Sequence, residues 1–378
     1  MHNQPTRQEE FTGNRGVLYL AFEMGSKEWK LGFVTQAGQK ARLRTIRSGD
    51  LLNLEEEIRR ASEKFGLEEP QVVSCYEAGR DGFWLHRYLT SRGIANVVVD
   101  PASVEVNRRS RRAKTDRLDA QMLLTRLIRF HSGEKKAWSV VRVPTPEQED
   151  ARHLSRELDA LKKEQTRHLN RLQGLLASQG LFLTIKRDFL SELDRVRLWD
   201  GSPLGPELKE RLRREYERLQ RVQEQTRALQ DKRKQRLATG EDPVAEKVKH
   251  LMRLKGVGEM SSWLFVLEFF AWRQFRNRRE VASLAGLTPT PYQSGDGNRE
   301  QGISKAGNPH LRRMIVEIAW SWLRWQPQSR LSLWFKQRFG QGNRRLRRVG
   351  IVALARRLLV ELWRYLQTGV VPDGAILS

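Results

Sequence analysis

Two acidic residues three positions apart, Asp116 and Asp119, open an apolar run and have the spacing of residues on one helical face. The run continues through Ala120 to Leu124. Five cations precede the acids: Arg108, Arg109, Arg111, Arg112 and Lys114. A carboxylate pair beside a basic arm suits a metal site that acts on a polyanion. An ordinary helix start, with Thr115 as the N-cap and acids complementing the helix dipole, explains the pair about as well.

Two further acids, Glu23 and Glu77, each end a short apolar run typical of a strand. If these strands were neighbours in one sheet, their ends would bring the four carboxylates within a few ångströms. Hard oxygen ligands of this kind hold Mg²⁺ or Mn²⁺, and a pair of such ions roughly 4 Å apart can clamp the two reacting oxygens of a phosphodiester. Taken singly, Glu77 is also explained as a loop acid and Glu23 as the partner of a nearby lysine.

The elements that must position these acids follow from hydrophobic patterning. Strands are expected at 17–23, 28–35, 41–46, 71–76 and 96–99, the first two joined by a glycine-containing turn at 24–27. Helices are expected at 51–65, through 83–89 and from Asp116 onward. Three meandering strands, helix, strand, helix, strand and helix is the order of a ribonuclease H-like (RuvC-like) α/β fold.

The rest of the chain is predicted to be mainly helical. Leucines at three- and four-residue steps in 154–176 and 208–229 predict two charged helices, which either fold back on each other, pair with another subunit or act as solvated spacers. A Trp-rich helix is expected at 310–325 and a basic amphipathic helix at 344–366. The domain prediction is therefore a tail (1–16), an α/β metal-binding domain (17–145), a coiled-coil arm (146–245) and an α-helical C-terminal domain (246–378).

Two features of the C-terminal domain bear on chemistry. Lys255-Gly256-Val257-Gly258 before a helix is typical of a helix-hairpin-helix turn that holds a phosphate, although a plain interhelix turn fits almost as well. Ser294 and Gly295 lie in a segment, 293–307, that is predicted to be a polar loop. A flexible linker accounts for this serine, because a serine nucleophile needs an activating base or metal and no histidine is nearby in sequence.

Composition narrows the class of partner. The 378 residues carry a formal net charge of +24, which favours nucleic acid. The apolar runs are too short to span a membrane and the polar start is unlike a signal peptide, so no membrane partner is expected. The single cysteine excludes an intramolecular disulfide and fits a reducing cytoplasm, and the scattered histidines predict no zinc site.

Three sets of residues, taken in order, resemble the insertion-sequence one-ten family of transposases, which includes Piv-type invertases and bridge-RNA-guided recombinases. They are Lys114-Thr115-Asp116-Arg117-Leu118-Asp119-Ala120, the strand end Tyr76-Glu77-Ala78-Gly79, and the series Gly286-Leu287-Thr288-Pro289, Ser294-Gly295, Gly302-Ile303-Ser304-Lys305 and Gly307-Asn308. The resemblance covers roughly residues 17 to 365.

The resemblance implies a metal-binding tetrad at Glu23, Glu77, Asp116 and Asp119 and a catalytic serine at Ser294. The first tetrad position is usually aspartate, so Glu23 is a departure that keeps the carboxylate but lengthens it. The resemblance also implies a homo-oligomer (dimer or tetramer), an active site shared between subunits, and a guide RNA that pairs with double-stranded donor and target DNA. The basic arm, the terminal helix, Lys255, Arg299 and Lys305 are then candidates for contacts with nucleic acid.

Two other functions fit much of the same sequence. A ribonuclease H-like nuclease of the junction-resolvase type would use metal-activated water and leave Ser294 as a loop residue. A nucleic-acid-binding protein without catalysis would need neither the tetrad nor the serine.

Overall fold

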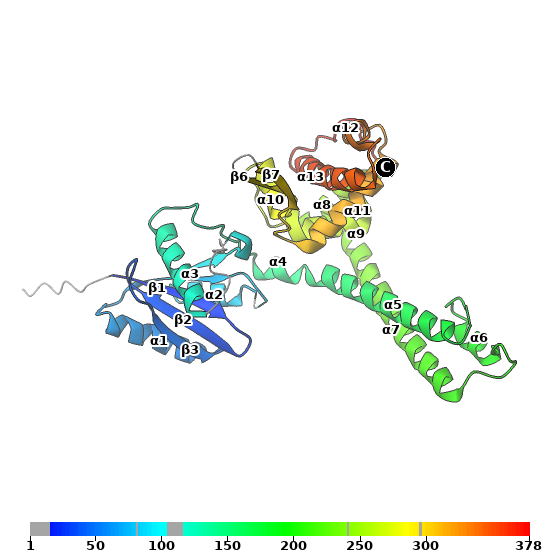
Figure 1. Ribbon diagram of the computed structural model, residues 1–378, viewed down its shortest axis with the longest axis horizontal. Helices are drawn as coiled ribbons and strands as arrows, with labels where there is room; N and C mark the ends of the chain where they lie inside the picture. Colours follow the sequence, from blue (N-terminus) through cyan, green and yellow to red (C-terminus); the bar gives the residue numbers. More distant parts are fainter. Residues whose placement is uncertain (1–15, 81, 104–115, 240–241, 295–296) are drawn as a thin grey trace, which may run out of the picture. The chain divides into compact units, whose positions relative to one another are not determined.

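The computed structural model describes residues 16–80, 82–103, 116–239, 242–294 and 297–378. The chain divides into two compact units between Pro144 and Thr145 (Figure 1). None of the described helices combines the length and apolar character needed to cross a membrane.

The first unit contains a mixed five-stranded sheet in the order β3-β2-β1-β4-β5. Its strands are β1 (Val17–Met24), β2 (Glu28–Val34), β3 (Arg42–Arg47), β4 (Gln71–Glu77) and β5 (Ala95–Val99). The first three strands form an antiparallel meander, while β4 runs parallel to β1 and β5 parallel to β4. All five strands expected from the sequence are therefore confirmed.

Helices cover both faces of this sheet. Helices α1 (Leu51–Lys64) and α2 (Trp84–Ser91) pack on one face, against a core that includes Phe22 and Tyr76. Helix α3 (Asp116–His131) packs on the other face through Leu123, Leu124 and Leu127. Alternate residues of β1 and β4 enter the two cores, as the two-residue period of a strand requires. A 3-10 turn, η1 (Pro101–Ser103), follows β5.

The second unit begins with a helical arm. It consists of α4 (Pro146–Asp150), α5 (His153–Ala177), α6 (Phe189–Arg195) and α7 (Pro206–Ala238). Helices α5 and α7 pack on each other along the arm, so of the arrangements left open by the sequence the chain adopts the one that folds back on itself (Figure 1). Leu172, Leu176, Leu212, Tyr216 and Leu219 form the centre of their core.

The remainder of the second unit is a helical core that carries a two-stranded ribbon. Its elements are α8 (Pro243–Met252), α9 (Glu259–Phe265), the π-helical turn η3 (Val266–Phe270), α10 (Arg278–Leu284), β6 (Pro289–Ser294), β7 (Gly297–Ile303), α11 (Pro309–Trp325), α12 (Arg330–Phe339) and α13 (Arg344–Thr368). Trp263 and Trp322 are fully buried in the largest hydrophobic core of the described residues. Division of this unit into an arm and a separate C-terminal domain stays a prediction.

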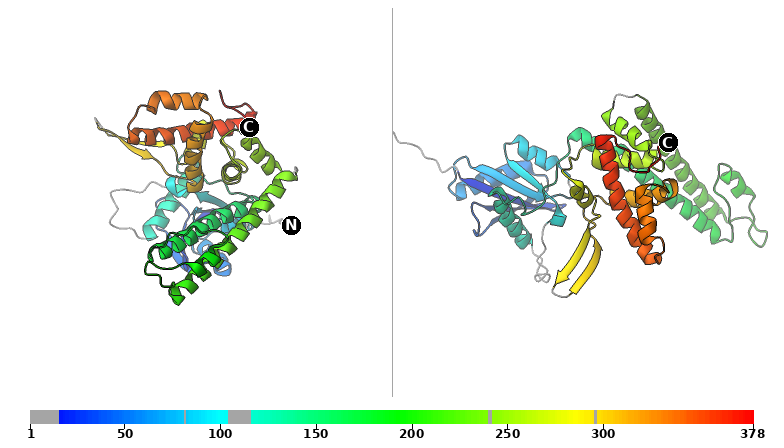
Figure 2. Two further views of the ribbon diagram at one scale, coloured as in Figure 1. Left: turned by 90° about the vertical axis from the view of Figure 1, so that its right-hand side faces the viewer. Right: turned by 90° about the horizontal axis from the view of Figure 1, so that it is seen from above.

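The polar loop expected at 293–307 is wrong, because most of this segment is strand. Ser294 ends β6 and β7 begins at Gly297, so the two strands form an antiparallel hairpin (Figure 2). The segment contains four glycines and lacks alternating apolar residues, and β6 carries Pro289 and Pro291. Prolines and glycines are depleted in strands, so pairing across the hairpin creates a ribbon that local pattern does not indicate.

Candidate functional site

Two of the predicted acids meet at the carboxyl ends of neighbouring parallel strands. Phe22 of β1 pairs with Tyr76 of β4, and the next residues along the two strands are Glu23 and Glu77. Neighbouring strands are about 4.8 Å apart, so the backbones of these two acids lie side by side. Because Phe22 and Tyr76 face α1 and α2, Glu23 and Glu77 belong to the opposite face, which α3 covers.

Helix α3 runs antiparallel to β1 and starts at this same edge. At the end of the helix, the Tyr19 hydroxyl is 2.9 Å from His131 Nδ1, near the start of β1. Closer to its beginning, the buried Ala120 packs over Gly32, where an added β-carbon would lie 3.5 Å from Ala120 Cβ. Gly32 pairs with Ala21, two residues before Glu23. The first turn of α3, which contains Asp116 and Asp119, therefore lies toward the strand ends that carry Glu23 and Glu77.

The packing of α3 explains why this arrangement needs Gly32. A β-carbon there would also lie 3.1 Å from Leu124 Cδ1, a contact tighter than ordinary van der Waals packing. The absence of a side chain lets the helix approach the sheet closely over β1 and β2. The height of α3 above the sheet, and with it the position of its first turn, depends on this glycine.

The described side chains at the edge are a partly buried Glu23 and an exposed Glu77. Lys30 is the cross-strand neighbour of Glu23, so the alternative of a carboxylate balanced by lysine stays open. Burial, and secondarily the charge of Glu77, raise the pKa of the Cys75 thiol, which keeps it protonated and unreactive. Among the side chains that the structure describes, no three His, Cys, Asp or Glu residues form a metal-binding group. The side chains of Asp116 and Asp119 lie outside the described ones.

Ser294 lies in the second unit, as the last residue of β6. Its backbone pairs with Gly297, so it stands at the distal end of the hairpin, next to residues 295–296, which lie outside the described residues. The serine thus has a defined strand position in place of a flexible linker. The tetrad acids and Ser294 belong to different units.

The base of this hairpin is fixed by two interlocking backbone segments. A β-carbon at Gly286 would lie 1.9 Å from the Ala306 carbonyl oxygen, and one at Gly307 would lie 2.1 Å from the Leu284 carbonyl oxygen. Both glycines have positive φ angles, +68° and +85°. The amide of Ser304 donates to the Thr288 carbonyl at 2.9 Å, and that of Lys305 to the Gly286 carbonyl at 3.1 Å. The glycines of the family-like motif therefore hold the two ends of the hairpin together.

A buried carboxylate connects the hairpin base to the arm. Glu268, in the π-helical turn η3, is 5% exposed and accepts two hydrogen bonds from the Arg156 guanidinium of α5, at 2.7 and 3.0 Å. Its second oxygen also accepts from the Asn308 side-chain amide at 3.0 Å. Asn308 caps α11 directly after the segment that carries Gly307. Hydrogen bonding to Glu268 raises the pKa of the Arg156 guanidinium.

These positioning residues were not predicted from the sequence. Arg156 is far along the chain from Glu268, and neither residue belongs to a recognisable motif. A partial signal was available for Asn308, because an asparagine directly before a proline that opens an apolar helix is a favoured N-cap.

The predicted nucleic-acid contacts have varied positions. Lys255 and Lys305 are exposed, and the ammonium of Lys255 lies 5.7 Å from the centre of the Trp325 ring. Arg299 lies on β7, paired with Tyr292. Arg108, Arg109, Arg111, Arg112 and Lys114 lie outside the described residues.

The turn between α8 and α9 is packed into the helical core. Gly256 has φ +92°, and its carbonyl accepts a hydrogen bond of 2.9 Å from the Ser321 hydroxyl. Val257 is buried. Packing against the core accounts for the conformation of this turn, and its contact with a phosphate stays a prediction.

Two family models match parts of the chain. Residues 248–333 match the model of the Transposase IS116/IS110/IS902 family, and residues 31–179 match a DEDD transposase model of IS110 elements. Ser294 lies within the first range and Glu77, Asp116 and Asp119 within the second, whereas Glu23 precedes it.

Full-length similarity points to the same class. The chain is 41% identical over 381 residues to a putative transposase, y4rJ, of Sinorhizobium fredii, with 96% of this chain and 95% of the relative covered. It is 24% identical over 305 residues to the transposase for insertion sequence element IS1533 of Leptospira borgpetersenii, covering 80% and 84% of the two chains. It is 27% identical over 300 residues to the transposase for insertion sequence element IS1111A of Coxiella burnetii, covering 78% of each.

The chain is therefore an insertion-sequence transposase, a class of enzymes that cut and rejoin DNA. Within that class, it belongs to the IS110 family.

Proposed function

We propose that this transposase cuts and rejoins DNA through a serine nucleophile, Ser294, at a centre completed by a divalent metal on Glu23, Glu77, Asp116 and Asp119. The observation that carries the proposal is the register of β1 and β4, which sets two acids side by side on the face where α3 begins. A strand order of β3-β2-β1-β4-β5, with β3, β2 and β1 antiparallel, supports a ribonuclease H-like assignment for the first unit.

The donor chemistry at the sheet edge fits a hard divalent cation. Carboxylate oxygens are the ligands that Mg²⁺ and Mn²⁺ prefer, and the residues proposed here are all carboxylates. Cys75, on the same face, is buried and protonated and so does not compete as a soft ligand. A metal ion bound here would supply electrostatic stabilisation for the charge that develops on the phosphate and would favour the ionised form of an oxygen nucleophile.

The serine step balances without an external energy source. The Ser294 oxygen forms a new ester bond to the scissile phosphorus, and the bond from phosphorus to the departing strand breaks. The serine proton leaves to solvent, and the departing strand oxygen takes up a proton. One phosphate ester replaces another, so attack by a hydroxyl of a second strand reverses the step and rejoins the DNA.

The position of Ser294 at the end of a hairpin supports its role as a nucleophile. The interlocked Gly286 and Gly307 segments and the Glu268 cluster fix the base of the ribbon, while its tip carries the serine. A nucleophile on a paired strand is oriented more narrowly than one on a free loop.

Guidance by a structured RNA and assembly into a dimer or tetramer are parts of the same proposal. Their support is the family membership and the net charge of +24. Sequencing the RNA that copurifies with the protein tests the guide: an RNA whose loops match the flanks of the element is expected, and random cellular RNA would contradict it. Mixing Ser294→Ala and Glu77→Gln chains tests shared sites, since active mixed oligomers require the two residues to come from different subunits.

The decisive experiment traps protein on a nicked DNA substrate in Mg²⁺ and maps the attached peptide. A covalent adduct at Ser294 is expected, and it should be absent from Ser294→Ala and restored in part by Ser294→Cys. Cleavage that persists in Ser294→Ala without an adduct would instead identify a nuclease that uses metal-activated water. Unchanged recombination in cells carrying Glu77→Gln or Asp116→Ala would contradict the metal site.

The unusual first acid is tested separately. If Glu23 is a ligand, Glu23→Asp should retain cleavage and shift the Mg²⁺ concentration needed for half-maximal rate, whereas Glu23→Gln should abolish cleavage. Equal activity of Glu23→Gln and the native chain would remove Glu23 from the site.

A further inference from the structure

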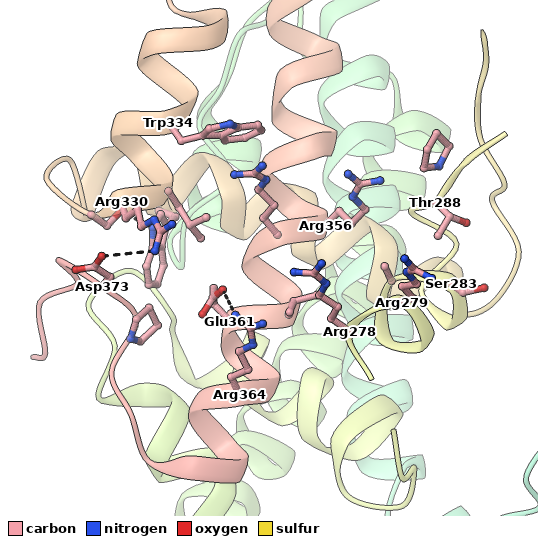
Figure 3. Close-up of a pocket in the computed structure, with 18 residues that line it drawn as sticks. Arg278, Arg279, Ser283, Thr288, Arg330, Trp334, Arg356, Glu361, Arg364 and Asp373 are labelled. Carbon is pink, nitrogen blue, oxygen red and sulfur yellow. Dashed lines mark hydrogen bonds and ion pairs between the residues drawn. The ribbon is translucent and has the colours of Figure 1, made fainter. Parts of the chain in front are cut away.

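A recess in the second unit is lined by arginines from three helices. It has a volume of about 1120 Å³ between α10, α12 and α13 (Figure 3). The arginines are Arg278, Arg279, Arg330, Arg356, Arg357 and Arg364. Two carboxylates, Glu361 and Asp373, also line it, and they pair with Arg364 at 2.9 Å and Arg330 at 3.9 Å. Positive charge is therefore in excess.

Four of these guanidinium groups, those of Arg278, Arg279, Arg356 and Arg357, have no carboxylate partner among the described residues. Burial lowers the pKa of Arg357, and the like charges of Arg356, Arg338 and Arg330 lower it further. Like charges held together weaken the folded state unless an anion relieves them. The cluster thus has the electrostatics of a binding site more than of a stabilising network.

The chemistry of the lining favours phosphate. All the cations are arginines, and the planar guanidinium binds phosphate oxygens through two parallel hydrogen bonds. The half-buried Trp334, whose ring centre lies 3.9 Å from the Arg357 guanidinium, forms an apolar part of the wall suited to the sugar faces between phosphates. The volume exceeds the range of about 300–1,000 Å³ usual for small-molecule sites, which favours a polymer over a single anion.

The positive surface continues beyond the recess. The first turns of α13 contain Arg344, Arg345, Arg347 and Arg348, all exposed. Cations at a helix N-terminus oppose the helix dipole, so they do not serve the stability of α13. They extend the line of charge along the helix that carries Arg356 and Arg357, as a polyanion would require.

The recess also adjoins the start of the strand that carries the proposed nucleophile. Thr288 and Pro289, at the start of β6, line it, and Ser294 is at the other end of that strand. Five residues of strand span about 17 Å, which is about five base-pair steps along duplex DNA at 3.4 Å each.

We infer that this arginine recess holds the phosphodiester backbone of the DNA substrate within about five base pairs of the bond that Ser294 attacks. The inference rests on the proposed function for the identity of the nucleophile, but the binding itself needs neither serine nor metal. It gives the C-terminal unit a backbone anchor that positions the scissile strand without reading its sequence.

The test measures binding of full-length protein to a 5′-labelled duplex of the element end by fluorescence anisotropy at several salt concentrations. All chains carry Ser294→Ala and the buffer contains EDTA, so failure of the covalent or metal proposal does not affect the result. Replacing Arg278, Arg279, Arg356 and Arg357 by Gln should reduce the magnitude of the slope of log K against log salt by about 3.6, since each of the four phosphate contacts contributes about 0.9. The same four positions changed to Lys should retain most of the slope and show that the chain folds.

A matched control removes four exposed cations of α7 that form no ion pair with any described residue, through Arg211→Gln, Arg221→Gln, Arg227→Gln and Lys232→Gln. The slope should fall by less than about one in this control. An equal fall in both variants would overturn the inference, because general charge would then explain the binding. Loss of binding to a labelled RNA with duplex binding unchanged would also overturn it.

Footprinting gives an independent measure of position. In this assay, ethylated phosphates that contact the protein interfere with DNA binding. The phosphates that interfere with binding by the chain with native arginines, but not by the four-Gln variant, should cluster within about five base pairs of the cleavage site. Interference sites that lie elsewhere, or that persist in the variant, would contradict the placement.

Discussion

Substitution of Gly286 by alanine should loosen the hairpin that carries Ser294. The new β-carbon would lie 1.9 Å from the Ala306 carbonyl oxygen and 2.6 Å from Arg312 Nη1. The residue would also keep a φ of +68°, which costs an L-residue about 1–2 kcal/mol. Displacing the backbone of the 304–307 segment adds about 1–3 kcal/mol, so we expect a total of roughly 2–5 kcal/mol.

Hydrogen exchange of the peptide that spans 302–312 measures this cost locally. The amides of Ser304 and Lys305, which donate across the interlock, should exchange faster by roughly two orders of magnitude or more, in proportion to the lost free energy. The rate of adduct formation at Ser294 should fall in parallel, while exchange in the first unit stays unchanged.

Gly302→Ala is the matched control. Gly302 has φ +86°, yet nothing lies within 4 Å of a β-carbon built on it, so only the backbone strain of about 1–2 kcal/mol applies. If the two variants exchange equally fast, the collision with Ala306 does not hold the hairpin and the reasoning is refuted.

Three other predictions follow from the packing of each region. Gly32→Val should displace α3 from the sheet and lower the folding stability by about 1–3 kcal/mol. It should also weaken Mn²⁺ binding, measured by titration calorimetry, although no acid is changed. An unchanged affinity for Mn²⁺ would contradict the link between the height of α3 and the metal site. In the arm, burial opposes ionisation of Glu215, but hydrogen bonds from a histidine and an arginine hold its pKa below the ordinary 4.5. The contribution of Glu215 to folding stability should therefore be fully present above pH 4.5 and be lost as the pH falls below that value. In thermal melts at several pH values, the melting temperature of Glu215→Gln should fall less steeply at acid pH than that of the native chain. Gln326→Ala should cost about 2–4 kcal/mol and expose residues 374–378 to proteolysis, because its buried side-chain amide donates to the Lys255 and Ile376 carbonyls and accepts from the Ile376 amide; the exposed control Gln337→Ala should leave proteolysis of this segment unchanged.

Much of the fold was predictable because its signals are local. Short apolar and β-branched runs bounded by turns located the strands, and three- and four-residue periods located α1, α5 and α7. A Trp-rich segment and a basic amphipathic segment located α11 and α13. The bounds agreed closely, as for the helix expected at 51–65 and observed at Leu51–Lys64. The hairpin β6–β7 was missed because its residues have strong turn propensity, and pairing between the two adjacent strands overrides that propensity.

The candidate site divides in the same way. By itself the sequence determined the residue types, the family motifs and the strand order that makes Glu23 and Glu77 candidates for one edge. Only the tertiary structure decided that these acids are register neighbours on the face covered by α3, that Gly286 meets Ala306, and that arginines of three helices share a recess. Local patterns specify elements because each depends on neighbours in the chain. Contacts between segments far apart in sequence depend on register and close packing, which no local pattern encodes.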